Sequence, residues 1–326
     1  MPLPLPNSSA ARRLLSVLVT LGCLAVLARI VNLRELGTVL ASANVLLLLV
    51  AVLARVFDRL VMIGKWFPLL RVQLPDVSLW HATRAYIVSG LAVYLVPISV
   101  GADVIRAATL GRDEKAVPEV GASIIAERLL GFAATGLLSL VSLYVAFAMS
   151  VKLTFVLPWA LAAIVLGLVA LVAPFSQRLS SWALRSIESL HWIPGRGFVG
   201  KMAMAYRVYG NHPRLLLGVG MASLFEQFLP VVIAWFIALA LGISVTFPML
   251  MAAMPLALFA GRVPVSFGGI GVTEGAIVYL LGLFGVPVVE ALALSLVGRA
   301  IDILVVSVPG AFMWKEMVRR RQVVTT

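Results

Sequence analysis

The chain has 326 residues, of which 62% are hydrophobic and only 12% charged, and its mean hydropathy is +1.07. No soluble domain has this composition, and apolar runs of about 18 residues or more recur along the chain, so we expect an all-α polytopic membrane protein. The segments lack the period-two alternation of a membrane barrel. The net charge of +12 does not indicate nucleic acid, because the basic residues flank apolar spans, where they set topology and meet anionic lipid.

Neither a metal site nor a cofactor is expected. The single cysteine, Cys23, excludes an internal disulfide and a cysteine-based metal site. Three histidines, His81, His191 and His212, are scattered without metal-ligand spacing. The stretch Gly268-Gly-Ile-Gly271 fits neither the dinucleotide nor the P-loop spacing, and no strand precedes it, so nucleotide binding is not expected.

The first apolar segment, 14–33, follows Arg12 and Arg13 and resembles a signal peptide. It is long and lacks a small-x-small cleavage site, so we expect a retained first helix. The second segment, 45–63, carries three charged residues on one helical face. These residues are Arg55, Asp58 and Arg59. Their side chains either reach the membrane surface or face a cavity, and the depth of Arg55 in the apolar segment favours the cavity.

The remaining segments alternate between unbroken and broken helices. The segment 79–110 is interrupted at Pro97 and Gly101, and 247–284 is interrupted between Pro264 and Gly271. The only long polar connection is 175–214, and no linker marks a second domain, so 1–326 is expected to form one membrane domain. Unbroken spans are expected at 119–150, 155–172, 215–241 and 288–313.

A short pattern occurs twice. Val96-Pro-Ile-Ser-Val-Gly-Ala102 matches Val263-Pro-Val-Ser-Phe-Gly-Gly269, and a second Val-Pro and a long helix with an arginine follow each copy. Broken helices at corresponding places in two repeats point to a transporter-type site, although each break could also be an ordinary loop between two short helices. The repeat halves are about 12–150 and 154–314. The re-entrant hinge residues are Pro97, Gly101, Pro264, Gly268, Gly269 and Gly271.

The distribution of basic residues predicts the orientation. Both termini and the connection 175–214 belong in the cytoplasm by the positive-inside rule, and Lys152 on the far side. The basic segments 65–71 and 106–115 can both be cytoplasmic only if 79–110 returns without crossing. We therefore expect six full transmembrane helices and two re-entrant broken-helix hairpins, arranged as an inverted-topology repeat in the cell (inner) membrane.

Charges inside the apolar segments are the candidate headgroup-binding residues, because an intramembrane charge is costly unless it is paired or lines a cavity. Arginine suits phosphate through its planar fork. Pairing across the repeat is expected, with Glu127 or Glu274 facing Arg299 or Arg128, whereas Asp302 could neutralise Arg299 from three residues away. Arg106 and Glu274 hold similar places in the two hairpins and are expected to meet. The complete set is Arg106, Arg128, Arg262, Arg299, Glu127, Glu274 and Asp302.

Three stretches resemble the lysylphosphatidylglycerol synthetase transmembrane-region family: 97–106, Ala126-Glu-Arg-Leu129 and 264–274. The closing helix, 291–310, is similar as well. The resemblance implies a flippase-like domain with re-entrant helices and a polar cavity open to the bilayer. Because the sequence ends at Thr326, we expect a stand-alone member without the soluble aminoacyltransferase domain.

The leading hypothesis is translocation of a phosphate-bearing lipid or glycolipid headgroup, with Glu274 or Glu127 balancing a cationic headgroup or carrying a proton. The expected partners are membrane lipids, in particular anionic phospholipid or glycolipid, and a homo-oligomer or a lipid-synthesis enzyme partner is left open. One alternative is a membrane enzyme of lipid or polyprenyl headgroup metabolism, for which we find no nucleophile with a base and no acidic metal cluster. The other is a non-transporting scaffold for lipid-synthesis enzymes.

Overall fold

The computed structural model describes residues 32–95, 101–113, 116–151, 207–262 and 269–324, together with Ser266 and a few isolated positions. Every regular element in these ranges is a helix, which confirms the all-α class. The protein is membrane-embedded: three described helices are long and apolar enough to cross a bilayer. They are α6 (Val117–Ala148), α10 (Pro213–Leu241) and α13 (Val288–Val324), the last of these over Val288–Trp314.

A fourth span follows if α2 (Leu33–Ala41) and α3 (Val45–Gln73) are taken together, although the chain bends by 87° between them. Asparagines explain where both helices begin, since the side chains of Asn32 and Asn44 each accept hydrogen bonds from backbone N–H groups of the following turn. The expected spans 14–33 and 155–172 lie almost entirely outside the described residues, and so does most of the connection 175–214.

Both expected helix breaks are present. Helix α4 (Leu79–Leu95) is followed by α5 (Gly101–Asp113), and α11 (Phe247–Gly261) by α12 (Val272–Gly282). Of the expected hinge residues, Gly101 begins α5 and Gly271 is the N-cap of α12. Pro97, Pro264 and Gly268 lie outside the described residues.

Glycine is required at the second break. Gly269 and Gly271 have φ angles of +76° and +82°, which side chains disfavour. A Cβ atom on Gly269 would also lie 2.8 Å from the carbonyl oxygen of Gly261, and one on Gly261 would meet the hydroxyl of Thr273. The end of α11 and the start of α12 therefore approach each other more closely than any larger residue allows.

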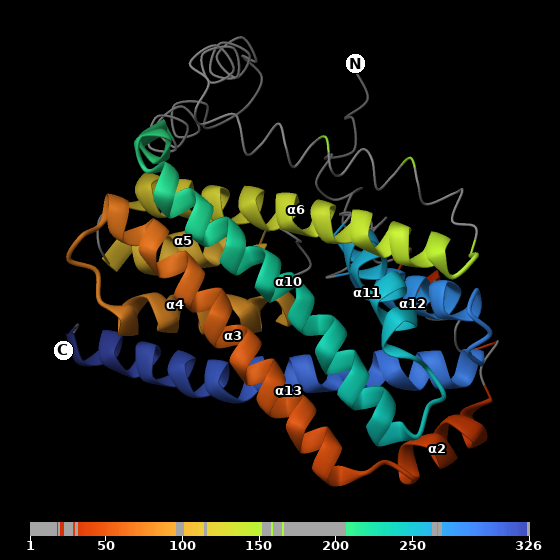
Figure 1. Cartoon of the computed structure of the whole chain (residues 1–326). Coiled ribbons are helices and arrows are strands. Elements are labelled where there is room, and N and C mark those ends of the chain that lie inside the picture. Colours follow the sequence, from red (N-terminus) through yellow and green to blue (C-terminus); the bar gives the residue numbers. More distant parts are fainter. Residues whose placement is uncertain are drawn as a thin grey trace, which may run out of the picture.

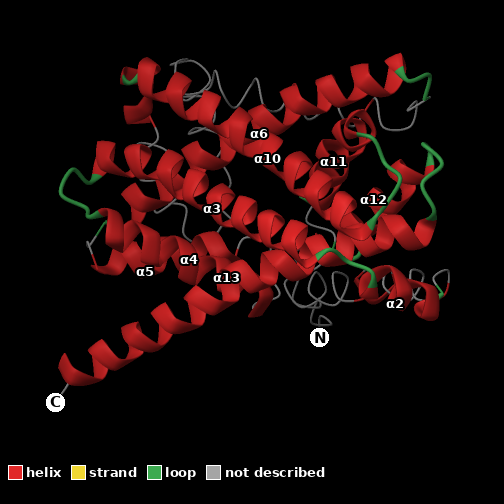
Figure 2. Ribbon diagram, turned by 60° about the horizontal axis from the view of Figure 1, so that its bottom comes forward, coloured by secondary structure: helices red, strands yellow, loops and turns green. Residues whose placement is uncertain are grey.

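Two long helices lie on opposite sides of the protein, and two others cross between them. Figure 1 shows α6 along one side and α13 along the other, with α3 and α10 crossing between them. The pair α4–α5 fills one end and the pair α11–α12 the other. Helix α4 packs on α13 and α11 on α6, while α5 packs on α6 and α12 on α13. Figure 2 shows the C-terminal turns of α13 running out beyond the other helices.

The interior is packed with aliphatic side chains around α10. Ile233, Ile237, Leu250, Leu281 and Leu294 are almost completely buried in one cluster that joins α10 to α11, α12 and α13. A second cluster around Trp66, Leu70 and Val120 joins α3 to α4, α5 and α6. Because α11 is apolar on all sides, it is suited to a position between other helices and lipid.

A side-chain hydroxyl compensates for a proline inside α11. Pro255 has no N–H group, so the carbonyl oxygen of Met251, one turn earlier, loses its helical partner. The Ser142 hydroxyl on α6 lies 2.8 Å from that oxygen. An unsatisfied carbonyl is expensive where no water is available, so this contact fixes α11 against α6 as well as satisfying the backbone.

Candidate functional site

A cavity of about 360 Å³ lies between α3, α10, α11, α12 and α13, a volume within the range of ligand sites. Its wall carries an unusual density of charge for an apolar chain. Five arginines line it, Arg55, Arg59, Arg128, Arg262 and Arg299, together with four carboxylates, Asp58, Glu226, Glu274 and Asp302. We call it the charged cavity.

On one side of the charged cavity, α3 is joined to α13 by ion pairs. Arg55 lies 3.1 Å from Asp58 on its own helix, and its Nε lies 3.0 Å from Oδ1 of Asp302. Arg59 donates to the same oxygen at 2.9 Å. Asp302 therefore faces α3, where two guanidinium groups converge on it, and its ion pairs among the described residues are with α3 and not with Arg299.

Arg299 instead binds Glu274 of its own half, so the expected pairing across the repeat is not the one that the described residues form. Its Nη2 and Nε lie 2.7 and 2.8 Å from Oε1 of Glu274. The other carboxylate oxygen of Glu274 accepts a hydrogen bond of 2.7 Å from the backbone N–H of Gly271, at the start of α12. Glu274 thus caps α12 and holds it to α13 at the same time.

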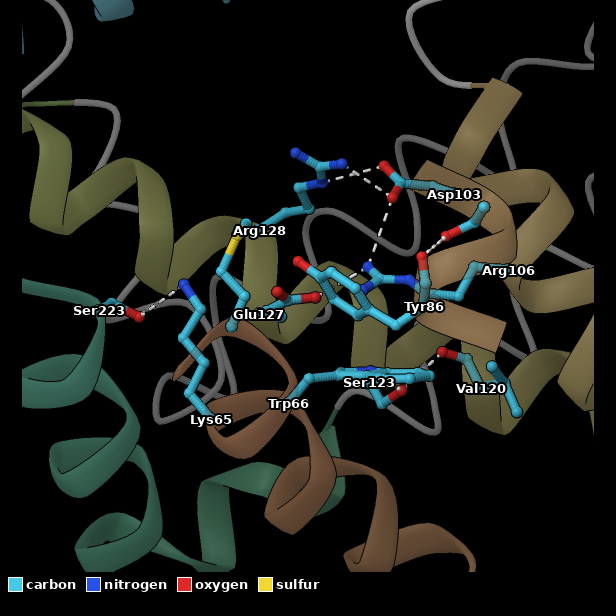
Figure 3. Close-up of polar contacts among 12 residues, drawn as sticks. Lys65, Trp66, Tyr86, Asp103, Arg106, Val120, Ser123, Glu127, Arg128 and Ser223 are labelled. Carbon is cyan, nitrogen blue, oxygen red and sulfur yellow. Dashed lines mark hydrogen bonds and ion pairs between the residues drawn. The ribbon is translucent and has the colours of Figure 1, made fainter. Parts of the chain in front are cut away.

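Asp103 and Arg128 form the matching contact between α5 and α6, which Figure 3 shows. The Nε and Nη2 groups of Arg128 donate to the two carboxylate oxygens of Asp103 at 3.0 and 2.9 Å, a bidentate pair. The Arg128 side chain is 53% exposed. It therefore reaches the charged cavity while its guanidinium stays bound to α5.

The structure places Arg106 and Glu127 behind this wall and not among the residues that line it. Arg106 lies 2.8 Å from Glu127 and 3.4 Å from Asp103. Its guanidinium carbon lies 4.5 Å from the ring centre of Trp66 and 4.8 Å from that of Tyr86 (Figure 3). The expected meeting of Arg106 with Glu274 does not occur, because each is already bound to a partner on the neighbouring long helix.

Lys65 is the one cation of this network that the sequence did not indicate. Its Nζ lies 3.0 Å from Glu226 and 3.4 Å from the hydroxyl of Ser223, and both ion-pair side chains are buried. The sequence assigned Lys65 to a basic segment outside the membrane, because the apolar run ends at residue 63. Helix α3 continues to Gln73, and the added turns carry Lys65 to α10.

Arg262 differs from the other cations because it forms no ion pair with any described carboxylate. Its Nη1 donates to the hydroxyl of Thr135 and lies 3.4 Å from the carbonyl oxygen of Gly131. Its guanidinium also lies over the ring of Phe132 at 5.5 Å. Neutral groups of α6 therefore hold Arg262 in place without neutralising it.

Five of the seven expected site residues, Arg128, Arg262, Arg299, Glu274 and Asp302, line the charged cavity. Lining residues outside that set include Arg55, Asp58, Arg59, Glu226 and Thr273. The sequence analysis had favoured a cavity for Arg55, Asp58 and Arg59, which share one helical face. In the part of the chain that the structure describes, no three His, Cys, Asp or Glu side chains gather as a metal site would require.

Comparison with known proteins supplies one match. Residues 13–310 match the family described as the lysylphosphatidylglycerol synthase TM region. Comparison with curated proteins and with solved structures gives no significant match.

Proposed function

The chain belongs to the lysylphosphatidylglycerol synthase transmembrane-region family, and from that premise we propose that it translocates a phosphate-bearing lipid or glycolipid headgroup across the membrane. The headgroup would occupy the charged cavity while the acyl chains stay in hydrocarbon. We propose in addition that the chain is not an enzyme and that it lies in the cell (inner) membrane with both termini in the cytoplasm.

The observation that carries this proposal is the charged cavity itself. Nine ionisable side chains face one space of about 360 Å³ between helices that are otherwise apolar. Keeping charges at membrane depth costs several kcal/mol each when they are unsatisfied, so a packed apolar interior would be the more stable arrangement for a purely structural protein. Arginines predominate, and their planar donor groups match phosphate oxygens.

The packing of the helices supports an inverted repeat around that cavity. Each broken pair contacts a long helix from the other half through its first arm, since α4 packs on α13 and α11 on α6. Each second arm packs on the long helix of its own half, α5 on α6 and α12 on α13. We propose that α4–α5 and α11–α12 are re-entrant hairpins that approach the cavity from opposite membrane surfaces, as in transporters built from inverted repeats.

Headgroup sidedness in reconstituted vesicles tests the proposal. The full chain is incorporated into liposomes containing a trace of lipid with a fluorescent headgroup, and the fraction that reaches the outer leaflet is measured by chemical quenching. We expect faster exchange of phosphate-bearing lipids than in protein-free liposomes. Exchange at the protein-free rate for every phosphate-bearing lipid would reject translocation and favour the scaffold or enzyme alternatives.

A matched pair of glycine variants links the exchange to the cavity. Gly298→Leu places a side chain in the charged cavity, where a Cβ atom would lie 3.7 Å from Ile237. Gly282→Leu adds the same side chain at an exposed position outside the cavity with nothing within 4 Å. We expect Gly298→Leu to block exchange and Gly282→Leu to leave it unchanged.

A further inference from the structure

Among the residues that the structure describes, the charged cavity and the ion pairs attached to it contain one more cation than carboxylates. The basic members are Arg55, Arg59, Lys65, Arg106, Arg128, Arg262 and Arg299, and the acidic members are Asp58, Asp103, Glu127, Glu226, Glu274 and Asp302. Every cation in this set except Arg262 has a carboxylate partner. The excess positive charge therefore lies at Arg262.

The paired cations are poor candidates for a permanent anion site. Taking Arg299 from Glu274, or Lys65 from Glu226, would leave a buried carboxylate without a counter-ion, and both carboxylates are about 5% exposed or less. Such a loss is strongly destabilising, because the desolvation of the remaining charge is no longer offset. Binding an anion at Arg262 breaks no ion pair among the described residues.

The surroundings of Arg262 hold its guanidinium in position for a ligand. It follows the last residue of α11 directly and reaches back to α6, where one terminal nitrogen contacts Thr135 and Gly131. The same side chain lines the charged cavity. A guanidinium offers five N–H donors, and the contacts with α6 use only one terminal nitrogen of Arg262.

We propose that the charged cavity binds a headgroup with a single net negative charge, a phosphodiester whose phosphate lies against Arg262. This deepens the proposed translocation and rests on it for the lipid source of the phosphate. A monoanionic headgroup neutralises the cavity, whereas a zwitterionic one leaves its excess positive charge in place. A dianionic headgroup exceeds that charge and needs a second cation, which the buried ion pairs of Arg299 and Lys65 do not release.

Binding to the purified full chain tests this assignment. Short-chain phosphatidylglycerol, with one negative charge, is titrated calorimetrically against short-chain phosphatidylcholine, which is zwitterionic. We expect phosphatidylglycerol to bind about 10- to 100-fold more tightly, the value of one charge-assisted contact to phosphate. Glycerophosphoglycerol, the same headgroup without acyl chains, and inorganic phosphate form two further arms. Weaker binding of both by about tenfold or more identifies a lipid site, whereas equal binding identifies a site for free phosphate.

Three variants locate the charge. Arg262→Gln should abolish the preference for phosphatidylglycerol, and Arg262→Lys should restore part of it, since lysine keeps the charge but loses the planar fork. Arg207→Gln removes an exposed positive charge outside the cavity and should leave the preference unchanged. Melting temperatures of all variants are measured in parallel; we expect Arg262→Gln to melt no lower than the wild type, because it removes an uncompensated charge.

Equal binding of phosphatidylglycerol and phosphatidylcholine by the wild type, or an unchanged preference in Arg262→Gln, would overturn the assignment. Either result leaves the proposed translocation standing if vesicle exchange is observed. Conversely, selective binding at Arg262 without exchange in vesicles would reject translocation while keeping the anion site. The anion site and the translocation can thus be rejected independently of each other.

Discussion

Asp103 and Glu274 occupy equivalent positions in the two halves of the protein. Each is the third residue of the short helix that follows a break, α5 in one case and α12 in the other. Each binds an arginine 25 residues further along the chain, and that arginine is the twelfth residue of the long helix that follows. The sequence had matched Glu274 with Arg106 instead, which lies about one helical turn beyond Asp103.

Because Glu274 is the ion-pair partner of Arg299, neutralising Glu274 frees a second arginine of the charged cavity. Glu274→Gln keeps a side-chain oxygen for the N–H of Gly271, so α12 stays capped, but removes the charge that holds Arg299. We expect binding of a dianionic lipid such as phosphatidic acid to tighten about tenfold or more. Glu290→Gln, outside the cavity, is the control, and unaltered affinity for phosphatidic acid in Glu274→Gln would contradict the expectation.

Arg106 should prove structural. Arg106→Leu leaves the carboxylate of Glu127 buried without its cation, which costs about 3–5 kcal/mol in comparable pairs. The double change Arg106→Leu with Glu127→Leu removes both charges and should recover most of the lost stability. The measurement is thermal unfolding of the purified protein. A single variant as stable as the wild type would show that the pair and its aromatic neighbours contribute little.

Two serines on α6 provide a matched test of the carbonyl freed by Pro255. Ser142→Ala removes the hydroxyl that satisfies the carbonyl of Met251 and should cost about 1–3 kcal/mol. Ser139, one turn away and fully buried, has no hydrogen-bond partner for its hydroxyl among the described residues. Ser139→Ala should therefore be neutral or stabilising. Equal melting temperatures for the two variants would refute the role assigned to Ser142.

The second break should tolerate no side chain at Gly269. Gly269→Ala combines a positive φ angle with a contact of 2.8 Å to the carbonyl oxygen of Gly261, and we expect a loss of about 1–3 kcal/mol. Gly275→Ala, inside α12 with nothing within 4 Å, should instead stabilise by up to about 1 kcal/mol. Unfolding by heat distinguishes the two, and a stable Gly269→Ala variant would mean that the turn relaxes readily.

The proposed orientation is tested by labelling engineered cysteines with a membrane-impermeant reagent, after Cys23→Ser removes the native thiol. We expect Arg207→Cys, in the basic connection, to be labelled from the cytoplasmic side only. Lys152→Cys should be labelled from the opposite side only. Labelling of both positions from the same side would eliminate the inverted repeat, because the number of crossings between them would then be even.

The sequence by itself determined the features that depend on neighbouring residues. Hydropathy identified α6, α10 and α13 as spans, and proline and glycine placed both breaks, because a missing N–H group or a positive φ angle acts within one turn. It also showed that charge lies inside apolar segments. Only the tertiary structure decided which charges meet: Asp302 binds Arg59, 243 residues away, and not Arg299 on its own helix. Partner choice depends on how helices distant in sequence are packed, and so it was packing that left Arg262 without a described carboxylate partner.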